Sequence, residues 1–475
     1  MRGFDHRLNR REMLKTSLLG ALTTVPVLNQ ASTLALAEST PKATADCMIL
    51  LWLSGGMAQT ETFDPKRYTP FEPGIEAKRI LSTFPSIDTS VDNIKFSRGL
   101  EKIGEVMQYG TLIRSMRSAD LGFILHSRHQ YHFHTGYVPP LTVNAPSIGG
   151  VIARTLGPRE KGVPPYIDIG QRFDVGGEDF EVKAFHTAGF LGSEYGPLFV
   201  PEPADAVSTV QPPAGMSVKR FNERWERYQQ FVQAQKGTAY EDIAKQEFHQ
   251  ALDGAHQLMS SPAALAFDLS LEKKESYDLY NTGRFGLGCL LARRLAEAGA
   301  RFIEVAYEYI PFLGFDTHEN GHSRMEKLKQ EVDTPIAQLI KDLRERGLLD
   351  RTLVVIASEF GRDMITEGKP DQPVKDQVEV PEIVSEEKHY GMHRHFTGAS
   401  SVLLFGGGIK EGFLYGKTAD ERPCDTIENP VTVTDLHATL YHAMGIPADL
   451  NYTVEERPFF VTEDGKGKPI LDLFA

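Results

Sequence analysis

The sequence is poor in cysteine, and acidic residues outnumber basic ones. The cysteines Cys47, Cys289 and Cys424 are far apart and form no CxxC pair, which argues against a thiolate zinc site and allows at most one disulfide. With 51 Lys and Arg against 64 Asp and Glu, the formal net charge is −13. Nucleic acid is therefore not an expected partner, because phosphate binding needs a basic face. No GxGxxG follows the first apolar run, so a dinucleotide-dependent oxidoreductase has little support.

Beyond the N-terminus, the sequence has no apolar run long enough to cross a membrane. Residues 1–37 are typical of an export signal rather than of folded structure. Paired Arg10 and Arg11 precede an apolar stretch at 16–28, and small residues at 35–37 suit a signal peptidase. The pattern resembles a twin-arginine signal, which implies the twin-arginine export machinery as a partner and a periplasmic or otherwise exported protein. The alternative is a basic N-terminal tail or an uncleaved anchor.

Residues 38–475 are expected to form one α/β domain. The chain is 41% hydrophobic and 24% charged, as in soluble globular proteins. Short apolar runs predict buried strands of a largely parallel central sheet, and amphipathic stretches between several of them predict flanking helices. The strands are expected at 47–53, 110–116, 165–170, 301–307, 352–360 and 401–408, and helices at 284–299, 325–347 and 433–445.

Two segments depart from this alternation. Residues 196–283 are rich in Gln, Lys and Glu, and they predict a helical insertion that caps the sheet, with helices at 218–235 and 239–259. Residues 363–390 are acidic and contain prolines, which predicts a long surface loop near the site.

Ligands of open parallel α/β sheets bind outside the carboxyl ends of the strands, so the residues after each apolar run are the first candidates. Gly55 and Gly56 follow the first run and allow either close backbone approach to a ligand or a tight turn. A group of histidines follows the second run, and it could ligate metal, bind an oxyanion or activate a hydroxyl. The group consists of His126, His129, His132 and His134, with the hydroxyl of Thr135 beside it.

The segment GFDTHENGH at 314–322 follows the run at 301–307. Asp316 and His318 alternate, so both point to one face if the segment is extended. Carboxylate and imidazole at this spacing are common ligands of divalent cations. The alternative is the capped start of a helix, with Asn320 or Ser323 as the N-cap.

Two later segments add further candidates. Glu359 follows a buried strand, where a carboxylate needs either a cation or an ion pair, and Arg362 is the nearest partner in the sequence. Arg362 could also hold a tetrahedral anion through two hydrogen bonds. His393 and His395 precede the run at 401–408 and share one face of an extended segment.

Several motifs in order resemble the DUF1501 family over nearly all of residues 38–475. This family is similar to the alkaline phosphatase/sulfatase superfamily. The resemblance therefore implies an α/β sandwich with one or two divalent metals at the strand ends. The motifs are LWLSGGMAQTETFDPK, HTGY with PSIGGVIAR (134–154), GFDTHEN, LLDRTLVVIASEFGR (348–362), LLFGGGIKEG (403–412) and VTVTDLHATLYHAMGI (431–446).

The sequence departs from the superfamily pattern at several points. Ser54 stands where the first strand would end in an acid, Phe360 follows Glu359 where the superfamily has histidine, and MHRH replaces the family's usual RDH. No CxPSR occurs, so a formylglycine is not expected. One metal, which could be Zn, Ca, Mg or Mn, is the more economical interpretation. The ligands expected are Asp316, His318 and His395, with Glu359 and His393 as further candidates.

The expected reaction is hydrolysis of a sulfate or phosphate ester of a small molecule or glycan. Thr135 is the candidate nucleophile, with a water molecule as its equal rival. Arg362 and a histidine of 126–134, His129, would stabilise the anionic transition state. The alternative is a non-catalytic periplasmic scaffold or glycan-binding protein on a decayed hydrolase fold, which the absence of the first strand-end acid favours.

Overall fold

The computed structural model describes residues 40–139, 143–171, 187–212, 215–235, 243–307, 314–454 and 456–475. The expected export signal at 1–37 lies outside these residues and stays a prediction. Among the described residues, no helix has the length and apolar character needed to span a membrane.

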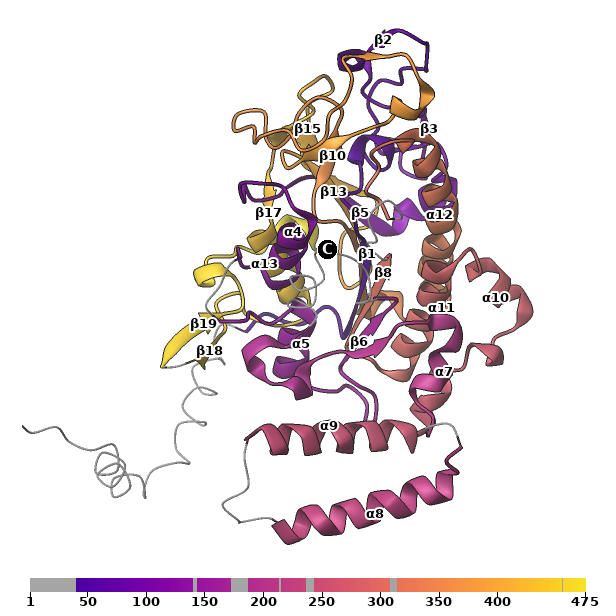
Figure 1. The fold of residues 1–475 in the computed structure, drawn as a ribbon, viewed down its shortest axis with the longest axis vertical. Helices are drawn as coiled ribbons and strands as arrows, with labels where there is room; N and C mark the ends of the chain where they lie inside the picture. The colour runs from indigo at the N-terminus through magenta and orange to yellow at the C-terminus, as the bar shows by residue number, and fades with distance from the viewer. Residues whose placement is uncertain are drawn as a thin grey trace, which may run out of the picture. The chain divides into compact units, whose positions relative to one another are not determined.

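A sheet of nine strands, counted over the described residues, lies at the centre of the fold (Figure 1). The strand order is β14–β5–β13–β9–β1–β8–β6–β7, and β17 pairs with β5 beside this path. The strands are β1 (Cys47–Leu53), β5 (Gly110–Arg117), β6 (Tyr166–Ile169), β7 (Leu198–Val200), β8 (Phe302–Tyr307), β9 (Thr352–Ala357), β13 (Ser400–Phe405), β14 (Phe413–Tyr415) and β17 (Val431–Thr432).

Most strand pairs of this sheet are parallel. β1 pairs in parallel with β8 and β9, and β6 does so with β7 and β8. The expected α/β class with a largely parallel sheet is therefore confirmed. β13 is the exception, since it runs antiparallel to both β5 and β9, and the expectation of a parallel strand at 401–408 was wrong. An apolar run predicts burial but has no direction, because either orientation buries the same side chains.

Burial on both faces explains why the strands are continuously apolar. Every residue of β1 is buried, and successive side chains point to opposite faces of the sheet. One face receives Cys47, Ile49, Leu51 and Leu53, and the other receives Met48, Leu50 and Trp52.

Helices cover both faces of the sheet, as Figure 1 shows. α11 ends where expected, because Gly299 adopts a left-handed φ of 96° that stops the helix. α12 begins at Gly321, four residues before the predicted start, which places residues 321–324 beside the site. One face packs against α3 (Glu101–Val106), α11 (Arg284–Ala298) and α12 (Gly321–Glu345), and the other against α4 (His126–Thr135), α5 (Ile148–Leu156) and α13 (Val433–Ala443).

The stretch 196–283 contains the two helices expected from its composition, and it also supplies β7 at the edge of the central sheet. Its helices are α7 (Ala206–Thr209), α8 (Val218–Gln235), α9 (Ile243–Met259) and α10 (Lys274–Tyr280).

The segment 363–390 has little regular structure, as predicted for a loop. It begins in a two-stranded antiparallel ribbon, in which β10 (Gly361–Asp363) pairs with β12 (Arg394–Phe396). The remaining short strands are β2 (Ile75–Glu76), β3 (Ser86–Asp88), β4 (Lys95–Ser97), β11 (Ile383–Val384), β15 (Lys417–Thr418), β16 (Thr426–Glu428), β18 (Asn451–Val454) and β19 (Arg457–Phe460).

Candidate metal centre

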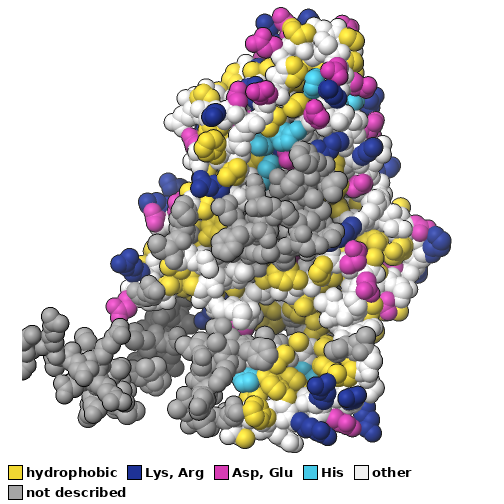
Figure 2. Space-filling model, viewed as in Figure 1, with side chains coloured by type: hydrophobic (Ala, Val, Ile, Leu, Met, Phe, Trp, Pro, Cys, Tyr) yellow, Lys and Arg dark blue, Asp and Glu magenta, His cyan; other side chains and the backbone are white. Residues whose placement is uncertain are grey.

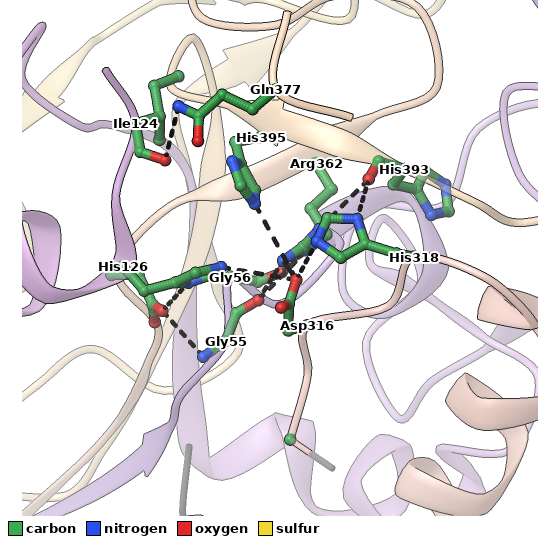
Figure 3. A network of polar contacts seen from close by, with 12 residues as sticks. Gly55, Gly56, Ile124, His126, Asp316, His318, Arg362, Gln377, His393 and His395 are labelled. Atoms are coloured by element: carbon green, nitrogen blue, oxygen red, sulfur yellow. Dashed lines mark hydrogen bonds and ion pairs between the residues drawn. The ribbon is translucent and has the colours of Figure 1, made fainter. Parts of the chain in front are cut away.

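Side chains from four segments converge beyond the carboxyl ends of the parallel strands (Figure 3). His126 is the first residue of α4, and Asp316 and His318 lie between β8 and α12. Arg362 lies in β10 and His395 in β12. Because β13 is antiparallel, the residues just before it lie at the same edge as the carboxyl ends of the other strands, and this orientation delivers His395.

The ribbon of β10 and β12 sets the relation between two of these side chains. Arg362 and His395 are directly opposite in the antiparallel register. Opposed residues of such a pair have side chains on the same face of the ribbon. Both side chains therefore face Asp316.

Backbone contacts fix the segment that carries Asp316. Arg324 of α12 donates from Nη1 to the carbonyl of Asp316 at 2.8 Å and from Nη2 to the carbonyl of Gly314 at 3.2 Å. Gly55 follows β1 with a φ of 109°, and a Cβ atom there would lie 2.4 Å from the amide nitrogen of Asp316. Glycine is thus required at position 55 both for conformation and for space.

The imidazoles gather around one carboxylate oxygen, Oδ1 of Asp316. Nε2 of His318 lies 2.7 Å from it, Nε2 of His126 lies 3.5 Å away, and Nε2 of His395 lies 4.0 Å away. His126, Asp316 and His395 each offer a ligand atom within 4.8 Å of the others, and all are buried. The structure therefore brings Asp316, His318 and His395 together, and His126 lies with them.

The opposite nitrogen of each ring faces a hydrogen-bond acceptor. In His318 either ring nitrogen can carry the proton of the neutral ring, because Nδ1 faces a backbone carbonyl and Nε2 faces Oδ1 of Asp316. Metal-ligating histidines typically show this arrangement, with the far ring nitrogen bound to a carboxylate or carbonyl. The contacts are His318 to the carbonyl of His393 at 3.1 Å, His126 to Oε1 of Glu359 at 2.7 Å, and His395 to Oε1 of Glu367 at 3.1 Å.

Charge inside the centre is balanced around Asp316. Burial would raise the pKa of Asp316, but the positive charges of Arg362 and His126 outweigh burial and hold that pKa well below its usual range. Burial opposes the charged form of His126, yet the carboxylates of Asp316 and Glu359 outweigh it and raise the pKa of His126 to about 9. The two carboxylates that flank His126 thus favour its charged form.

The surroundings of the other two imidazoles favour the neutral form. Burial lowers the pKa of His318, and burial with the nearby positive charges of His126 and Arg362 lowers the pKa of His395 well below its usual value. Nε2 of His395 has no hydrogen-bond partner among the described residues, although it is buried. A neutral, buried ring nitrogen facing a carboxylate suits a cation.

These residues fit a divalent metal ion. Imidazole nitrogens and one carboxylate oxygen are the donor set that proteins use for zinc and similar ions. The candidate ligands are His126, Asp316, His318 and His395.

Arg362 is fully buried and makes contacts in several directions. Its Nη2 donates to Oδ1 of Asp316 and to the carbonyl of Gly55, both at 2.5 Å. Nε donates to the carbonyl of Gly56 at 2.5 Å, and Nη1 donates to the carbonyl of His393 at 3.3 Å. Arg362 therefore holds the segments of the site together, and it pairs with Asp316 rather than with Glu359.

Glu359 faces the far side of the His126 ring. Oε1 accepts from the amide of Gly55 at 2.9 Å and from Nε2 of Gln130 at 3.2 Å, besides its contact with His126. Oε2 accepts from Oγ of Ser358 at 3.0 Å. Burial would raise the pKa of Glu359, but His126 outweighs it and lowers that pKa. The structure places Glu359 behind an imidazole rather than against Asp316.

The side chains of His393, His129 and Thr135 lie outside this group. Nε2 of His393 lies 3.4 Å from Oε1 of Glu61 instead. His129 contacts the carbonyls of Leu125 and Ala119. Thr135 donates to the carbonyl of Tyr131 at 2.7 Å. It is the last residue of α4, and a rise of about 1.5 Å per residue puts it ~13 Å along the helix from His126.

Glu367 is a residue of the site that the sequence did not indicate. It is buried, and burial raises its pKa to about 7. Its segment, 363–390, contains many acidic residues, so nothing in the local pattern distinguishes Glu367 from the solvent-exposed carboxylates around it.

The site is close to the surface. The side chain of His318 keeps 15% of its exposure, whereas those of Asp316 and His395 keep 7% and 6%. Figure 2 shows histidine side chains gathered at one place on the viewed face, next to an acidic group. His318 is thus the most accessible part of the cluster.

The fold and the site define an α/β protein with a histidine and carboxylate cluster at the carboxyl edge of a largely parallel sheet. The chain belongs to the family described as "Protein of unknown function (DUF1501)", whose model matches residues 45–474. The family predicted from the sequence motifs is confirmed. A comparison with curated protein sequences gives no match.

The chain is also similar to solved structures at low sequence identity. The lipoteichoic acid synthase LtaP from Listeria monocytogenes is 9% identical, with 92% of this chain and 81% of that chain covered and a TM-score of 0.37. The PsFucS1 sulfatase from Pseudoalteromonas sp. is 12% identical, with coverages of 94% and 78% and a TM-score of 0.34. A variant of the alkaline phosphatase PafA is 8% identical, with coverages of 91% and 100% and a TM-score of 0.40.

Proposed function

We propose that this protein is an exported, metal-dependent hydrolase of a sulfate or phosphate ester that uses one divalent ion. The observation that carries the proposal is the set of imidazole Nε2 atoms within 4.0 Å of one oxygen of Asp316. The ester class is what the resemblance of the sequence motifs implies, and the substrate would be a small ester or an ester of a glycan.

A divalent ion bound here supplies positive charge that polarises an ester oxygen and makes water more acidic. Asp316 balances that charge, and Arg362 keeps Asp316 ionised and oriented. The positive charge of the Arg362 guanidinium also favours one bound ion over two, because it would repel a second cation next to Asp316. His318 is the most exposed member of the cluster, so the ester would approach from its side.

The donor set favours zinc or another borderline transition ion. Calcium and magnesium prefer oxygen ligands, whereas imidazole nitrogen suits zinc, iron, cobalt and copper. Zinc is therefore the first ion to test.

Water is the proposed nucleophile. Thr135 lies ~13 Å along α4 from His126, and its hydroxyl is bonded to the carbonyl of Tyr131 at 2.7 Å. A nucleophile has to lie within about 3.5 Å of the reacting atom. Water that enters beside the partly exposed His318 would meet that requirement.

The second candidate function is a non-catalytic scaffold or glycan-binding protein. Two observations favour it. Ser54 replaces an acid at the end of β1, and its hydroxyl donates to the carbonyl of Tyr307. Arg362 is bonded to Asp316 and to backbone carbonyls, so it is not open to receive an anionic group.

Metal content and turnover separate the two functions. The purified protein is expected to contain one ion per chain and to hydrolyse an aryl sulfate or an aryl phosphate. His395→Ala and Asp316→Asn should lose both the ion and the turnover, while His442→Ala, a half-buried histidine of α13, should keep both. Stoichiometric metal without turnover on either ester would favour the scaffold, and absence of bound metal would refute the metal centre.

Export is supported by the sequence of residues 7–37 alone. Fractionation of cells that express the whole chain tests it. Replacement of the arginine pair by lysine, in Arg10→Lys/Arg11→Lys, is expected to retain the protein in the cytoplasm. An unchanged distribution between the fractions would contradict the twin-arginine route.

A further inference from the structure

Two buried carboxylates stand behind two imidazoles of the cluster, and one of them is hydrogen-bonded to its ring while the other lies close to its ring. Oε1 of Glu359 lies 2.7 Å from Nδ1 of His126, and Oε1 of Glu367 lies 3.1 Å from Nδ1 of His395. The two rings contact each other with centroids 4.8 Å apart and turn their Nε2 atoms toward Asp316. Each ring thus lies between an outer carboxylate and the central one.

We propose that Glu359 and Glu367 are positioning residues, which hold the Nδ1–H tautomer of His126 and His395 so that both Nε2 atoms bind the same ion. This inference rests on the proposed metal centre and adds the residues that orient its ligands. Both glutamates face the Nδ1 side of their rings, away from the Nε2 atoms that turn toward Asp316.

Glu367 carries the stronger argument. Its exposed fraction is 2%, and neither of its oxygens has a hydrogen-bond partner among the residues that the structure describes. A buried carboxylate without such partners destabilises a fold. Nδ1 of His395 lies 3.1 Å from Oε1 of Glu367 and likewise has no hydrogen-bond partner among the described residues, and a cation on Nε2 would make it a stronger donor to this carboxylate. The position of Glu367 is therefore explained by the ligand that it faces.

Glu359 is held more firmly than Glu367. The amide of Gly55, Gln130 and Ser358 donate to its two oxygens. These bonds orient the carboxylate toward His126 before any ion binds. Each glutamate therefore orients a different ligand. Glu359 does so from within a hydrogen-bond network, and Glu367 does so through a single contact.

The test uses Zn²⁺ binding to the metal-free full-length protein, measured by competition with a chromophoric chelator. Glu367→Leu and Glu367→Gln are compared with Glu379→Gln, an exposed glutamate of the same loop. We expect Glu367→Leu to lower the Zn²⁺ affinity by about 10–100-fold, Glu367→Gln to lower it less, and Glu379→Gln to leave it unchanged. Glu359→Gln should also lower the affinity, with one ion still bound at saturation.

A second measurement separates positioning from support of the fold. Removing an unsatisfied buried carboxylate should raise the melting temperature of the metal-free Glu367→Leu protein, even though its metal affinity falls. The visible spectrum of the Co²⁺ form should also change in Glu367→Leu and Glu359→Gln, but not in Glu379→Gln, because the orientation of the imidazoles changes.

Two results would overturn the inference, and they differ from each other. If the wild-type protein binds no Zn²⁺ at one ion per chain, the metal centre itself is refuted, and the positioning role with it. If the wild-type protein binds Zn²⁺ and both Glu367 variants bind it as tightly as Glu379→Gln, the metal centre stands and the positioning role of Glu367 is refuted.

Discussion

Nη2 of Arg362 lies 2.5 Å from Oδ1 of Asp316, the carboxylate oxygen that the imidazoles surround. The arginine side chain is fully buried, and its other donors are bonded to backbone carbonyls of Gly55, Gly56 and His393. This one residue neutralises the central carboxylate and joins three segments of the chain that meet at the site.

Replacing Arg362 with methionine is expected to destabilise the metal-free protein by about 3–5 kcal/mol, because Asp316 then remains buried without its guanidinium partner. Urea denaturation measures the change. Arg362→Lys should not restore stability, since one ammonium group cannot reach the carboxylate and the separate carbonyls. The double variant Arg362→Met/Asp316→Asn should recover part of the loss, and a single-variant cost below about 1 kcal/mol would contradict this account.

A close backbone approach at the start of α12 positions the segment that carries His395. A Cβ atom at Gly321 would lie 1.7 Å from the carbonyl oxygen of Gly391. Gly321→Ala is expected to destabilise the protein by more than about 2 kcal/mol, although alanine favours a helix over glycine by about 1 kcal/mol. It should also weaken metal binding, because the segment 391–395 must shift.

Gly254 is the matched control for that substitution. It lies within α9 and is exposed, and among the described residues a Cβ atom at this position would meet nothing within 4 Å beyond the local backbone of its own helix. Gly254→Ala should therefore stabilise the protein by up to about 1 kcal/mol. Thermal unfolding of both variants gives the comparison, and a loss of stability in Gly254→Ala equal to that in Gly321→Ala would disprove the steric explanation.

Lys329 gives the folding equilibrium a pH dependence. It is 1% exposed, and its Nζ donates to Oγ of Ser97 at 3.1 Å and lies 3.2 Å from the ring centroid of Phe84. Burial lowers the pKa of Lys329 to about 7. Above this pH the folded chain binds fewer protons than the unfolded chain, whose lysines titrate at about 10.4. The free energy of unfolding therefore decreases as the pH falls from the pKa of an unfolded lysine toward 7, and it increases again as the pH rises.

Between pH 7 and pH 9, the free energy of unfolding of the wild-type protein should increase by roughly 2–3 kcal/mol relative to that of Lys329→Met. Denaturant titrations of both proteins at the two pH values measure this difference. Methionine has a similar length and no charge, so it keeps the contact with Phe84. Parallel pH profiles for the two proteins would show that the ammonium group stays charged in the folded state.

The nucleophile can be tested by changing a hydroxyl that lies away from the cluster. Thr135→Val should keep kcat on the aryl ester within about threefold of the wild-type value, because its hydroxyl bonds backbone groups of Tyr131 and Tyr137 away from the cluster. Asp316→Asn should lower kcat by at least about 100-fold, because it removes a candidate metal ligand. Removing a ligand should lower activity more than changing a residue that only orients a ligand. A Thr135→Val protein that retains its metal but has no turnover would instead identify Thr135 as the nucleophile.

The amino-acid sequence by itself determined the elements and the chemistry available to them. Apolar runs predicted the strands, because a strand buried on both faces must be apolar at every position, and the motif order predicted the family. The pair Asp316 and His318 could also be found from the sequence, since alternation in an extended segment places both side chains on one face.

Only the tertiary structure decided which of these groups meet. The direction of β13 depends on its neighbours β5 and β9, and its antiparallel orientation brings His395 to the edge where His126 and Asp316 lie. Glu367 could not be distinguished from other acids of its loop, because its burial comes from contacts between segments distant in the sequence. The local sequence pattern specifies the periodicity and burial of each segment. Which charged side chains converge depends instead on how the strands are ordered in the sheet.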